Sequence, residues 1–220
     1  KNDSIGGDLE FQSEFNGNKL TYGLDFSEVD TSRLRTTKTV GGSTSEAKDT
    51  PDTKITRLGA YLQDEVSLGK FDFIAGLRFD NYDLDAKGDS LVSESVAKDL
   101  SADELTPKIA ATYNFTDKFT GYTSYSKGFR APAYYEVNAN FSNPRFGYTT
   151  KSNPNLKPET SDSYEVGLRG RYPKFDFNLA GFYNKYDNFI NQLSYIGVID
   201  GLATYQTQNV DEAEISGYEL

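Results

Sequence analysis

The chain contains no cysteine, histidine, methionine or tryptophan among its 220 residues. The absence of cysteine excludes disulfide bridges, thiolate metal sites and cysteine nucleophiles from these residues. The absence of histidine excludes serine–histidine triads and histidine zinc sites, and it removes the side chain that most often moves protons at neutral pH. Because most common enzyme mechanisms need one of these groups, we expect that the chain is not an enzyme.

Basic side chains are also few relative to acidic ones. The sequence has 23 Lys and Arg residues against 33 Asp and Glu residues, which gives a formal net charge of −10 and a pI near 4.6. A chain with this charge is repelled by the phosphate backbone of DNA and RNA. We therefore expect no nucleic-acid partner.

Long apolar runs are missing as well. Hydrophobic residues make up 36% of the chain, the mean hydropathy is −0.63, and no run approaches the roughly 18 apolar residues of a membrane helix. Aromatic residues nevertheless account for 14% of the chain, with 16 Tyr and 15 Phe. A barrel wall one residue thick has apolar side chains on one side and polar side chains on the other. Because these alternate along each strand, the mean hydropathy of the wall is low although one of its faces is apolar. Any membrane contact is expected to be made by strands.

The dominant pattern along the chain is an alternation of apolar and polar residues with a period of two. Near the N-terminus, Ile5, Leu9 and Phe15 share one face of an extended segment. Glu10 and Glu14 share the opposite face of the same segment. This period indicates a β-strand with one apolar and one polar face.

Segments of this kind recur along the chain and are separated by tight polar turns such as residues 16–19, where Asn and Gly tolerate positive φ angles. The expected strands cover residues 5–15, 20–26, 58–68, 71–79, 105–115, 119–126, 164–168, 175–183, 202–208 and 212–220. The pattern thus predicts an all-β chain of about ten antiparallel strands.

Long polar connections alternate with the short turns, at residues 29–53, 85–104, 127–159 and 187–200. This asymmetry is typical of outer-membrane β-barrels, which have tight turns on the periplasmic side and long loops outside the cell. A soluble sandwich also alternates apolar and polar residues, but long loops do not recur there on every second connection. We expect a transmembrane barrel, and we expect residues 41–53, rich in Gly, Ser, Thr and Asp, to form a mobile loop.

About ten strands are few for a barrel with an internal plug, for which about 22 strands are expected. The last residues, 214–220, form a strand-like run without a terminal aromatic residue. We therefore expect residues 1–220 to be an internal portion of a larger barrel domain, with its plug and remaining strands elsewhere.

Two short boxes carry the most specific signal. The first is Gly128-Phe129-Arg130-Ala131-Pro132, and the second is Asn153-Pro154-Asn155-Leu156-Lys157-Pro158-Glu159. They resemble the FRAP and NPNL boxes of TonB-dependent outer-membrane receptors, above all the branch that imports heme or takes it from hemoproteins. The motif residues are Phe129, Arg130, Ala131, Pro132, Asn153, Pro154, Asn155 and Leu156.

The resemblance implies a plugged, antiparallel transmembrane β-barrel in the outer membrane of a Gram-negative cell. Its expected partners are outer-membrane lipid, heme or a hemoprotein as cargo, and TonB with its inner-membrane energising complex. External loops would capture ferric heme, and energy delivered through TonB would drive its transport. No covalent chemistry on the cargo and no resident cofactor are implied.

In this family the segment between the boxes forms an external loop that helps to bind heme, often through a histidine that this chain lacks. Tyrosine is another ligand of ferric heme, and the resemblance implies that Tyr148 stands where tyrosine-using members of the family place theirs. Arg145 is expected to favour the phenolate or to pair with a heme propionate, and Phe146 is expected to stack on the porphyrin. Tyr134 and Tyr135 are further candidates, with a place in the aromatic girdle of the barrel as the alternative.

Other interpretations stay open at this point. Arg130 and the prolines of the boxes have a structural interpretation, in which they fix the ends of the loop against the strands. A ferric-siderophore receptor is the alternative within the family. A passive porin or adhesin barrel should lack the two boxes, and an outer-membrane protease or phospholipase would need a base that is absent from these residues.

Overall fold

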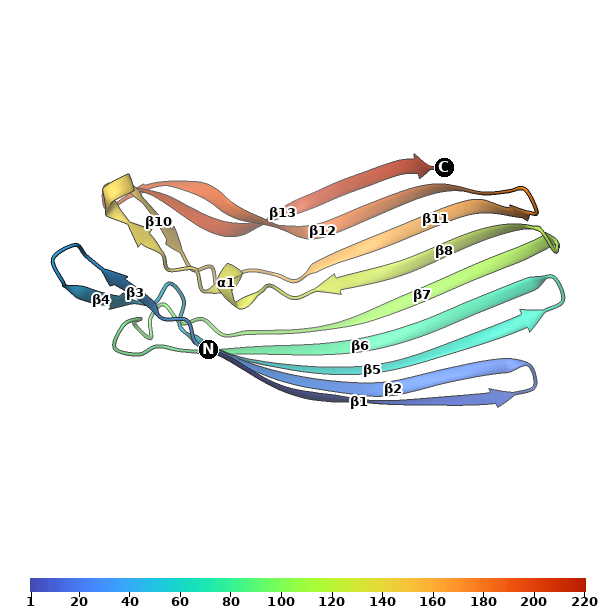
Figure 1. The fold of residues 1–220 in the computed structure, drawn as a ribbon, viewed down its shortest axis with the longest axis horizontal. Coiled ribbons are helices and arrows are strands. Elements are labelled where there is room, and N and C mark those ends of the chain that lie inside the picture. The colour runs from blue at the N-terminus through green and yellow to red at the C-terminus, as the bar shows by residue number, and fades with distance from the viewer.

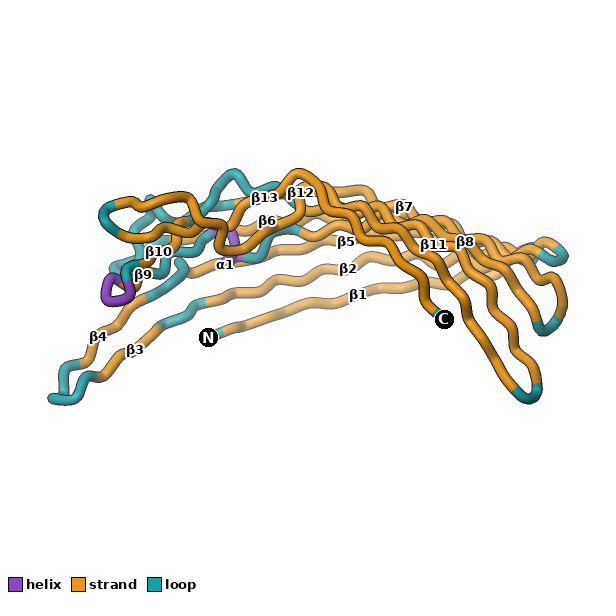
Figure 2. The backbone as a smooth tube through the Cα atoms, turned by 90° about the horizontal axis from the view of Figure 1, so that it is seen from above, coloured by secondary structure: helices purple, strands orange, loops and turns teal.

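The computed structural model describes all 220 residues, and most of them belong to one strongly curved, largely antiparallel sheet (Figure 1). Each long strand pairs with the next long strand along the chain, as the alternation predicts. Seen from above, the strands form an arch with β1 at one edge and β13 near the other (Figure 2). The long strands are β1 (Asn2–Phe15), β2 (Asn18–Thr31), β5 (Asp52–Leu68), β6 (Phe71–Lys87), β7 (Leu100–Thr116), β8 (Phe119–Arg130), β11 (Glu159–Tyr172), β12 (Phe175–Ile199) and β13 (Leu202–Glu219).

The two ends of the sheet differ (Figure 1). At one end the strands are joined by two-residue turns, such as Asn16-Gly17 and Gly69-Lys70. Asn16 and Gly17 have φ angles of 48° and 82°, which the tight turn requires and which Asn and Gly adopt most readily. The long connections gather at the other end, which confirms the asymmetry predicted from the sequence.

The long connections contain short elements of their own. Neither helix has the length and apolar character needed to span a membrane. One connection forms the hairpin β3–β4, so residues 41–53, expected to be a mobile loop, include a regular strand and the start of β5. The short elements are β3 (Arg35–Lys38), β4 (Thr44–Ala47), α1 (Tyr134–Val137), β9 (Ser142–Asn143), η1 (Pro144–Phe146) and β10 (Tyr148–Lys151).

The prediction was wrong for residues 187–220. Residues 187–200, expected to be a polar loop, continue β12 as far as Ile199. The two short strands expected at 202–208 and 212–220 are one strand, β13. The reason is that this hairpin extends past the apolar band, where neither face has to be apolar throughout and a strand need not alternate apolar and polar residues. Its irregular pattern comes from register shifts after Asn191 and from the positive φ angles of Asn188 and Leu193.

One face of the sheet is an exposed apolar band. The register places Leu24 between Leu9 and Ala60, and it places Phe79 between Ala60 and Leu105. Leu9, Leu24, Phe79 and Leu105 are all exposed. The band continues in the same way over the following strands, which is the arrangement of a lipid-facing barrel wall.

The opposite face is polar and carries cross-strand ion pairs. Arg78 donates two hydrogen bonds to Asp25, at 2.8 and 3.0 Å, and it also pairs with Asp80. To reach Asp25, the guanidinium crosses over Gly59 of the intervening strand. A Cβ atom at position 59 would lie 2.2 Å from Arg78 Nη2, so only glycine leaves room for this bridge.

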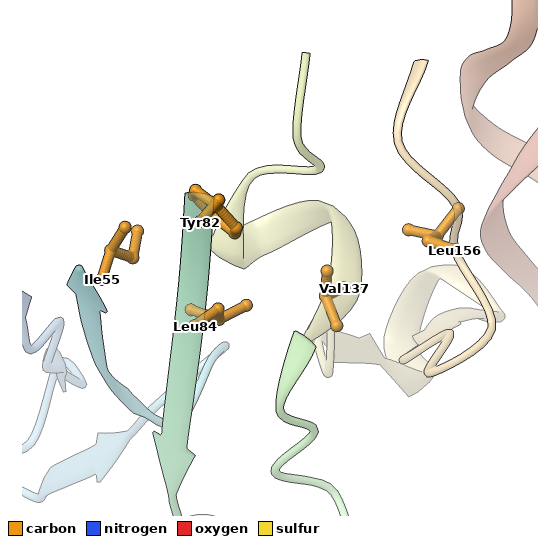
Figure 3. Packing of buried hydrophobic residues seen from close by; sticks show 5 residues of the cluster. All are labelled: Ile55, Tyr82, Leu84, Val137 and Leu156. Atoms are coloured by element: carbon orange, nitrogen blue, oxygen red, sulfur yellow. The ribbon is translucent and has the colours of Figure 1, made fainter. Parts of the chain in front are cut away.

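A small buried cluster at the loop end joins the sheet to the segment between the boxes (Figure 3). Ile55, Tyr82 and Leu84 of the sheet pack there with Val137 and Leu156. Because side chains alternate along a strand, Tyr82 lies on the same face of β6 as Asp80. The segment between the boxes therefore folds over the polar, inner face of the wall.

Candidate functional site

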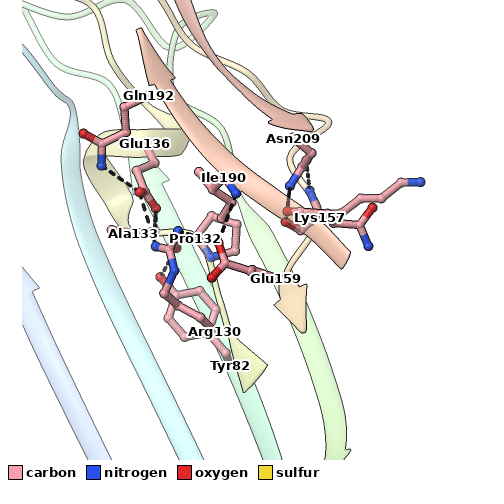
Figure 4. A network of polar contacts seen from close by, with 11 residues as sticks. Tyr82, Arg130, Pro132, Ala133, Glu136, Lys157, Glu159, Ile190, Gln192 and Asn209 are labelled. Carbon is pink, nitrogen blue, oxygen red and sulfur yellow. Dashed lines mark hydrogen bonds and ion pairs between the residues drawn. The ribbon is translucent and has the colours of Figure 1, made fainter. Parts of the chain in front are cut away.

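Residues 131–158, which we call the mouth loop, connect β8 to β11 and hold every predicted ligand residue. The last residue of β8, Arg130, lies directly before the loop, and its guanidinium contacts two carboxylates (Figure 4). Arg130 Nη1 lies 3.0 Å from Glu136 Oε2, and Arg130 Nη2 lies 3.2 Å from Glu159 Oε2. The side chain of Glu136 is only 2% exposed. A buried carboxylate needs such partners, because burial without them strongly disfavours its charge.

The same carboxylates tie the loop to itself and to β12. Glu136 accepts a hydrogen bond of 2.7 Å from the backbone N–H of Ala133 and one of 2.9 Å from Gln192 Nε2. Glu159 accepts one of 3.0 Å from the backbone N–H of Ile190. These bonds cross from the start of the mouth loop to the part of β12 that extends past the apolar band.

The remaining residues of the first box pack against the wall. Pro132 is buried, and its carbonyl accepts a hydrogen bond of 3.0 Å from the hydroxyl of Tyr82. Ala131 packs against the buried cluster. Phe129 is half-buried in β8 and pairs with Thr160 in the ladder. The contacts described for this box are thus with the wall and with the buried cluster.

The second box closes the loop against β13. The backbone N–H of Asn155 donates to Asn153 Oδ1 at 3.0 Å, which shapes the turn that contains the exposed Pro154. Asn153 Nδ2 donates to the carbonyl of Thr207 at 2.8 Å. Leu156 is 3% exposed and completes the buried cluster.

Tyr148 begins the short strand β10, which joins the sheet at the edge of β13. It pairs with Ala203 of β13 in parallel and with Asn143 of β9 in antiparallel. Its ring is half-buried and lies 5.7 Å from the ring of Phe141, centroid to centroid. The backbone of Tyr148 is thus fixed by strands on both sides.

Arg145 and Phe146 lie directly before Tyr148 in the 3-10 helix η1. Gly147 ends that helix with a φ of 72° and turns the chain into β10. Phe146 is 73% exposed, and Arg145 is also exposed and forms no ion pair. The structure therefore places both side chains at the surface, beside the start of β10.

Tyr134 and Tyr135 form a separate pair in α1. Their rings are 5.3 Å apart in an edge-to-face arrangement. Tyr134 packs against the buried cluster, whereas Tyr135 is 49% exposed. No aromatic contact joins either ring to Tyr148, so the sequence candidates divide into two groups within the loop.

Two anchors of the loop were not predicted from the sequence. The guanidinium of Arg35, from β3, lies 5.0 Å from the ring centroid of Phe141 and forms a 2.9 Å ion pair with Asp49. Asn138 is fully buried and bonds both backbone groups of Lys98, accepting at 2.7 Å and donating at 2.9 Å. No sequence pattern signals these pairs, because their members come from different connections.

A lysine joins the base of the β3–β4 hairpin to the connection between β6 and β7. Lys48 Nζ lies 2.7 Å from Asp52 and 2.6 Å from Asp89. The hydrogen bond from Lys48, followed by those from the backbone N–H groups of Leu91 and Val92, lowers the pKa of Asp89 to about 2. Burial opposes the charge of Lys48, but its two carboxylate partners outweigh that effect and raise its pKa.

Comparison with known proteins agrees with this architecture. The family model described as "TonB dependent receptor-like, beta-barrel" matches residues 1–220. The chain is 30% identical over 218 residues to the hemin receptor of Yersinia pestis, covering 91% of this chain and 29% of that protein. It is 31% identical over 189 residues to the hemoglobin-haptoglobin utilization protein B of Neisseria meningitidis serogroup C, covering 73% of this chain and 23% of that protein.

Solved structures share the fold. The hemophore receptor HasR of Serratia marcescens, in complex with its hemophore HasA and heme, matches 99% of this chain and 38% of its own, with a TM-score of 0.71 and 20% identity. A ferric enterobactin receptor from Pseudomonas aeruginosa matches 99% of this chain and 32% of its own, with a TM-score of 0.64 and 18% identity.

The chain spans about a quarter of the length of the curated relatives it matches, with 23% and 29% of the two proteins covered. Within that span, the strand order, the exposed apolar band and the end-to-end asymmetry are those of a barrel wall. Since the family model also covers all 220 residues, the chain belongs to the TonB-dependent receptor β-barrel family.

Proposed function

We propose that this chain is part of an outer-membrane receptor that takes up heme, free or from a hemoprotein, with energy delivered through TonB. The single observation that carries the proposal is the mouth loop, which is anchored at both boxes and holds Tyr148 on a short strand at the loop end of the wall. The relatives named for hemin and for hemoglobin-haptoglobin support this cargo. Transport of this kind requires no covalent change in the cargo.

The 220 residues form, on this proposal, an internal portion of a plugged barrel of about 22 strands. The arch of nine long strands and the share of each relative that the chain covers support that assignment. The exposed apolar band would contact outer-membrane lipid, and the mouth loop would face the outside of a Gram-negative cell.

We assign Tyr148 as the ligand of ferric heme iron. A phenolate is an established heme ligand, and its formation at neutral pH is favoured by the ferric ion and by nearby positive charge. The exposed guanidinium of Arg145 is available for that role or for a propionate, and the exposed ring of Phe146 is available to stack on the porphyrin. The Tyr134–Tyr135 pair is the second candidate for contact with the cargo.

Ferric-heme titration of the full-length receptor tests the assignment. In the wild type we expect saturable binding with a phenolate-to-iron charge-transfer band, because the ligand is an ionised tyrosine. Tyr148→Phe should remove that band and weaken binding at least tenfold, whereas the control Tyr135→Phe should keep the band. A band that persists in Tyr148→Phe would move the ligand to another residue.

A ferric-siderophore receptor is the second candidate, because a ferric enterobactin receptor shares the fold. Such a receptor recognises its cargo through cationic and aromatic side chains without supplying a ligand to the iron. Growth with heme or with a ferric siderophore as the sole iron source separates the two. Growth on heme that requires both the receptor and TonB supports the proposal, and growth on the siderophore alone contradicts it.

A further inference from the structure

The strands around Tyr148 fix its backbone but not its ring. β10 pairs with β13 on one side and with β9 on the other, and neither pairing sets the torsion angles of the tyrosine side chain. The only aromatic contact of this ring is with Phe141, at 5.7 Å between the centroids and 39° between the planes. The ring of Phe141 therefore restricts the directions in which the phenol of Tyr148 can point.

The backbone of Phe141 is held by β10 itself. Its N–H donates a hydrogen bond of 2.8 Å to the hydroxyl of the buried Thr150, and its carbonyl accepts one of 2.8 Å from the backbone N–H of the same residue. The hydroxyl of Thr149 donates to that carbonyl as well, at 3.1 Å. Because Thr149 and Thr150 directly follow Tyr148, the backbones of Phe141 and Tyr148 belong to one hydrogen-bonded unit. What these bonds leave open is the rotation of the Phe141 ring.

A cation from another connection contacts that ring. The guanidinium carbon of Arg35, in β3, lies 5.0 Å from the ring centroid of Phe141, and Arg35 Nη2 lies 2.9 Å from Asp49 Oδ1. The carbonyl of Asp49 accepts a hydrogen bond of 2.9 Å from the backbone N–H of Asn140, the residue before Phe141. Asp49 thus holds both the cation and the chain segment that carries the ring. A guanidinium can bind a carboxylate with its edge while its flat face lies against an aromatic ring.

We infer that Arg35 is a positioning residue for the iron ligand: it holds the ring of Phe141, and through that ring it restricts the phenol of Tyr148. The inference rests on the proposed function, because it concerns the geometry of the bond between Tyr148 and ferric iron. Arg35 contacts neither the iron nor the cargo in this role. The β3–β4 hairpin is thereby coupled to the heme site, although it belongs to a different connection of the wall.

Ferric-heme titration of the full-length receptor tests this role through the absorption spectrum as well as the affinity. Arg35→Gln should weaken heme binding about two- to fivefold, which is the effect of one exposed cation–π contact. The phenolate-to-iron charge-transfer band should remain, because Tyr148 is still present, but it should shift and broaden, because the phenolate meets the iron at a less defined angle. Arg35→Lys keeps a cation near the ring and should restore most of the affinity and of the band shape. The matched control is Lys38→Gln, which removes another exposed cation of β3 and should change neither quantity.

The background variant Phe141→Leu separates an action through the ring from an action on the cargo. If Arg35 acts through Phe141, Arg35→Gln causes no further loss of heme affinity in the Phe141→Leu receptor, because the contact that it would remove is already gone. A loss that persists in this background would mean that Arg35 contacts the cargo directly, and it overturns the inference.

Two further results overturn the inference. One is an affinity and a band in Arg35→Gln that equal those of the wild type. The other is an equal loss in Lys38→Gln, which would mean that only the charge of the hairpin matters. In all of these cases the wild type still shows the band, so the proposed function stands. A wild type without the band, or a band that persists in Tyr148→Phe, overturns the ligand assignment and this inference together.

Discussion

Arg130 and Glu136 illustrate how single side chains fix the mouth loop. The buried carboxylate of Glu136 receives hydrogen bonds from Arg130, from the backbone of Ala133 and from Gln192. Because removal of one member of a buried pair leaves the other uncompensated, neither residue is available to bind a cargo without loss of the loop. The arginine of the first box thus has two carboxylate partners within the protein, in contrast to Arg145, which has none.

Low pH should break the ion pair between Asp89 and Lys48 and so make the β3–β4 hairpin more mobile. The Asp89 pKa of about 2 lies below the value of about 3.9 for an unfolded aspartate. The stability that this group contributes is thus fully present above about pH 4 and is lost as the pH falls through about 2. The chain has no cysteine, so Ser45→Cys places one spin label on the hairpin. Its mobility should be constant from pH 8 to 5 and should rise between about pH 4 and 2.

Asp89→Asn should give the more mobile label already at neutral pH, because the amide carries no charge to hold Lys48. The control is Asp103→Asn, which replaces an exposed aspartate of β7 that has no ion pair. A label whose mobility is the same at pH 7 and pH 2 would contradict the role of Asp89.

At the scale of residues, the sequence selects candidate side chains but does not predict their contacts. The boxes and the absence of histidine suffice to select Tyr148, Arg145 and Phe146 as candidates. They do not reveal the pair between Arg35 and Phe141, because alternation assigns a residue to a face but does not say which loops meet.

At the scale of elements, the mouth loop connects other segments at the loop end of the sheet through hydrogen bonds. It bonds the connection between β6 and β7 through Asn138, and it bonds the hairpin connection through the backbone N–H of Asn140, which lies 2.9 Å from the carbonyl of Asp49. It bonds β13 through Asn153. Two connections and the strand β13, all far apart in sequence, are therefore held by one loop of 28 residues (131–158).

Asn138→Ala should detach residues 94–99 from the mouth loop. The side chain is buried, and its loss leaves both backbone groups of Lys98 without partners, at a cost of about 1–3 kcal/mol. Hydrogen exchange of the Lys98 amide should become about tenfold faster or more, while amides in the middle of β7 keep their protection. Asn140→Ala is the control, because the side chain of Asn140 makes no hydrogen bond. Equal exchange in both variants would show that Asn138 does not hold this connection.

Element boundaries could be predicted where the strands cross the apolar band, since one face must be apolar there. They could not be predicted in residues 187–200, where the β12–β13 hairpin leaves that band and neither of its faces has to be apolar throughout. The positive φ angles of Asn188 and Leu193 also interrupt the alternation of apolar and polar residues in this segment. Polar sequence is therefore compatible with a strand when pairing with a neighbour, rather than burial, holds it in place.

At the scale of the whole molecule, the two faces of the wall should respond differently to the same new charge. Leu62 lies in the apolar band and is 50% exposed, while its neighbour Gln63 lies on the polar face. Leu62→Arg should destabilise the folded barrel by about 2–4 kcal/mol, because it places a cation in lipid. Gln63→Arg should have an effect below about 1 kcal/mol, as expected for a wet surface. Urea unfolding of the full-length receptor in lipid vesicles measures both, and equal losses would contradict the assignment of the faces.

The architecture as a whole followed from three sequence features: the period of two, the alternation of short and long connections, and the low hydropathy with many aromatic residues. These are properties of a wall, and they hold for every strand. The curvature of the sheet and the inward fold of the mouth loop depend on contacts between distant residues, such as Tyr82 with Pro132, and no local pattern encodes them.

The parallel pairing of β10 with β13 has a consequence for the order of assembly. All long strands join a neighbour that precedes them directly, but β10 must wait until the chain has passed through β11 and β12 and returned as β13. Such distant pairing forms late and, with only four residues, opens easily. Detachment of β10 would break only this four-residue pairing and the two-residue pairing with β9, and it would leave every pairing between long strands intact.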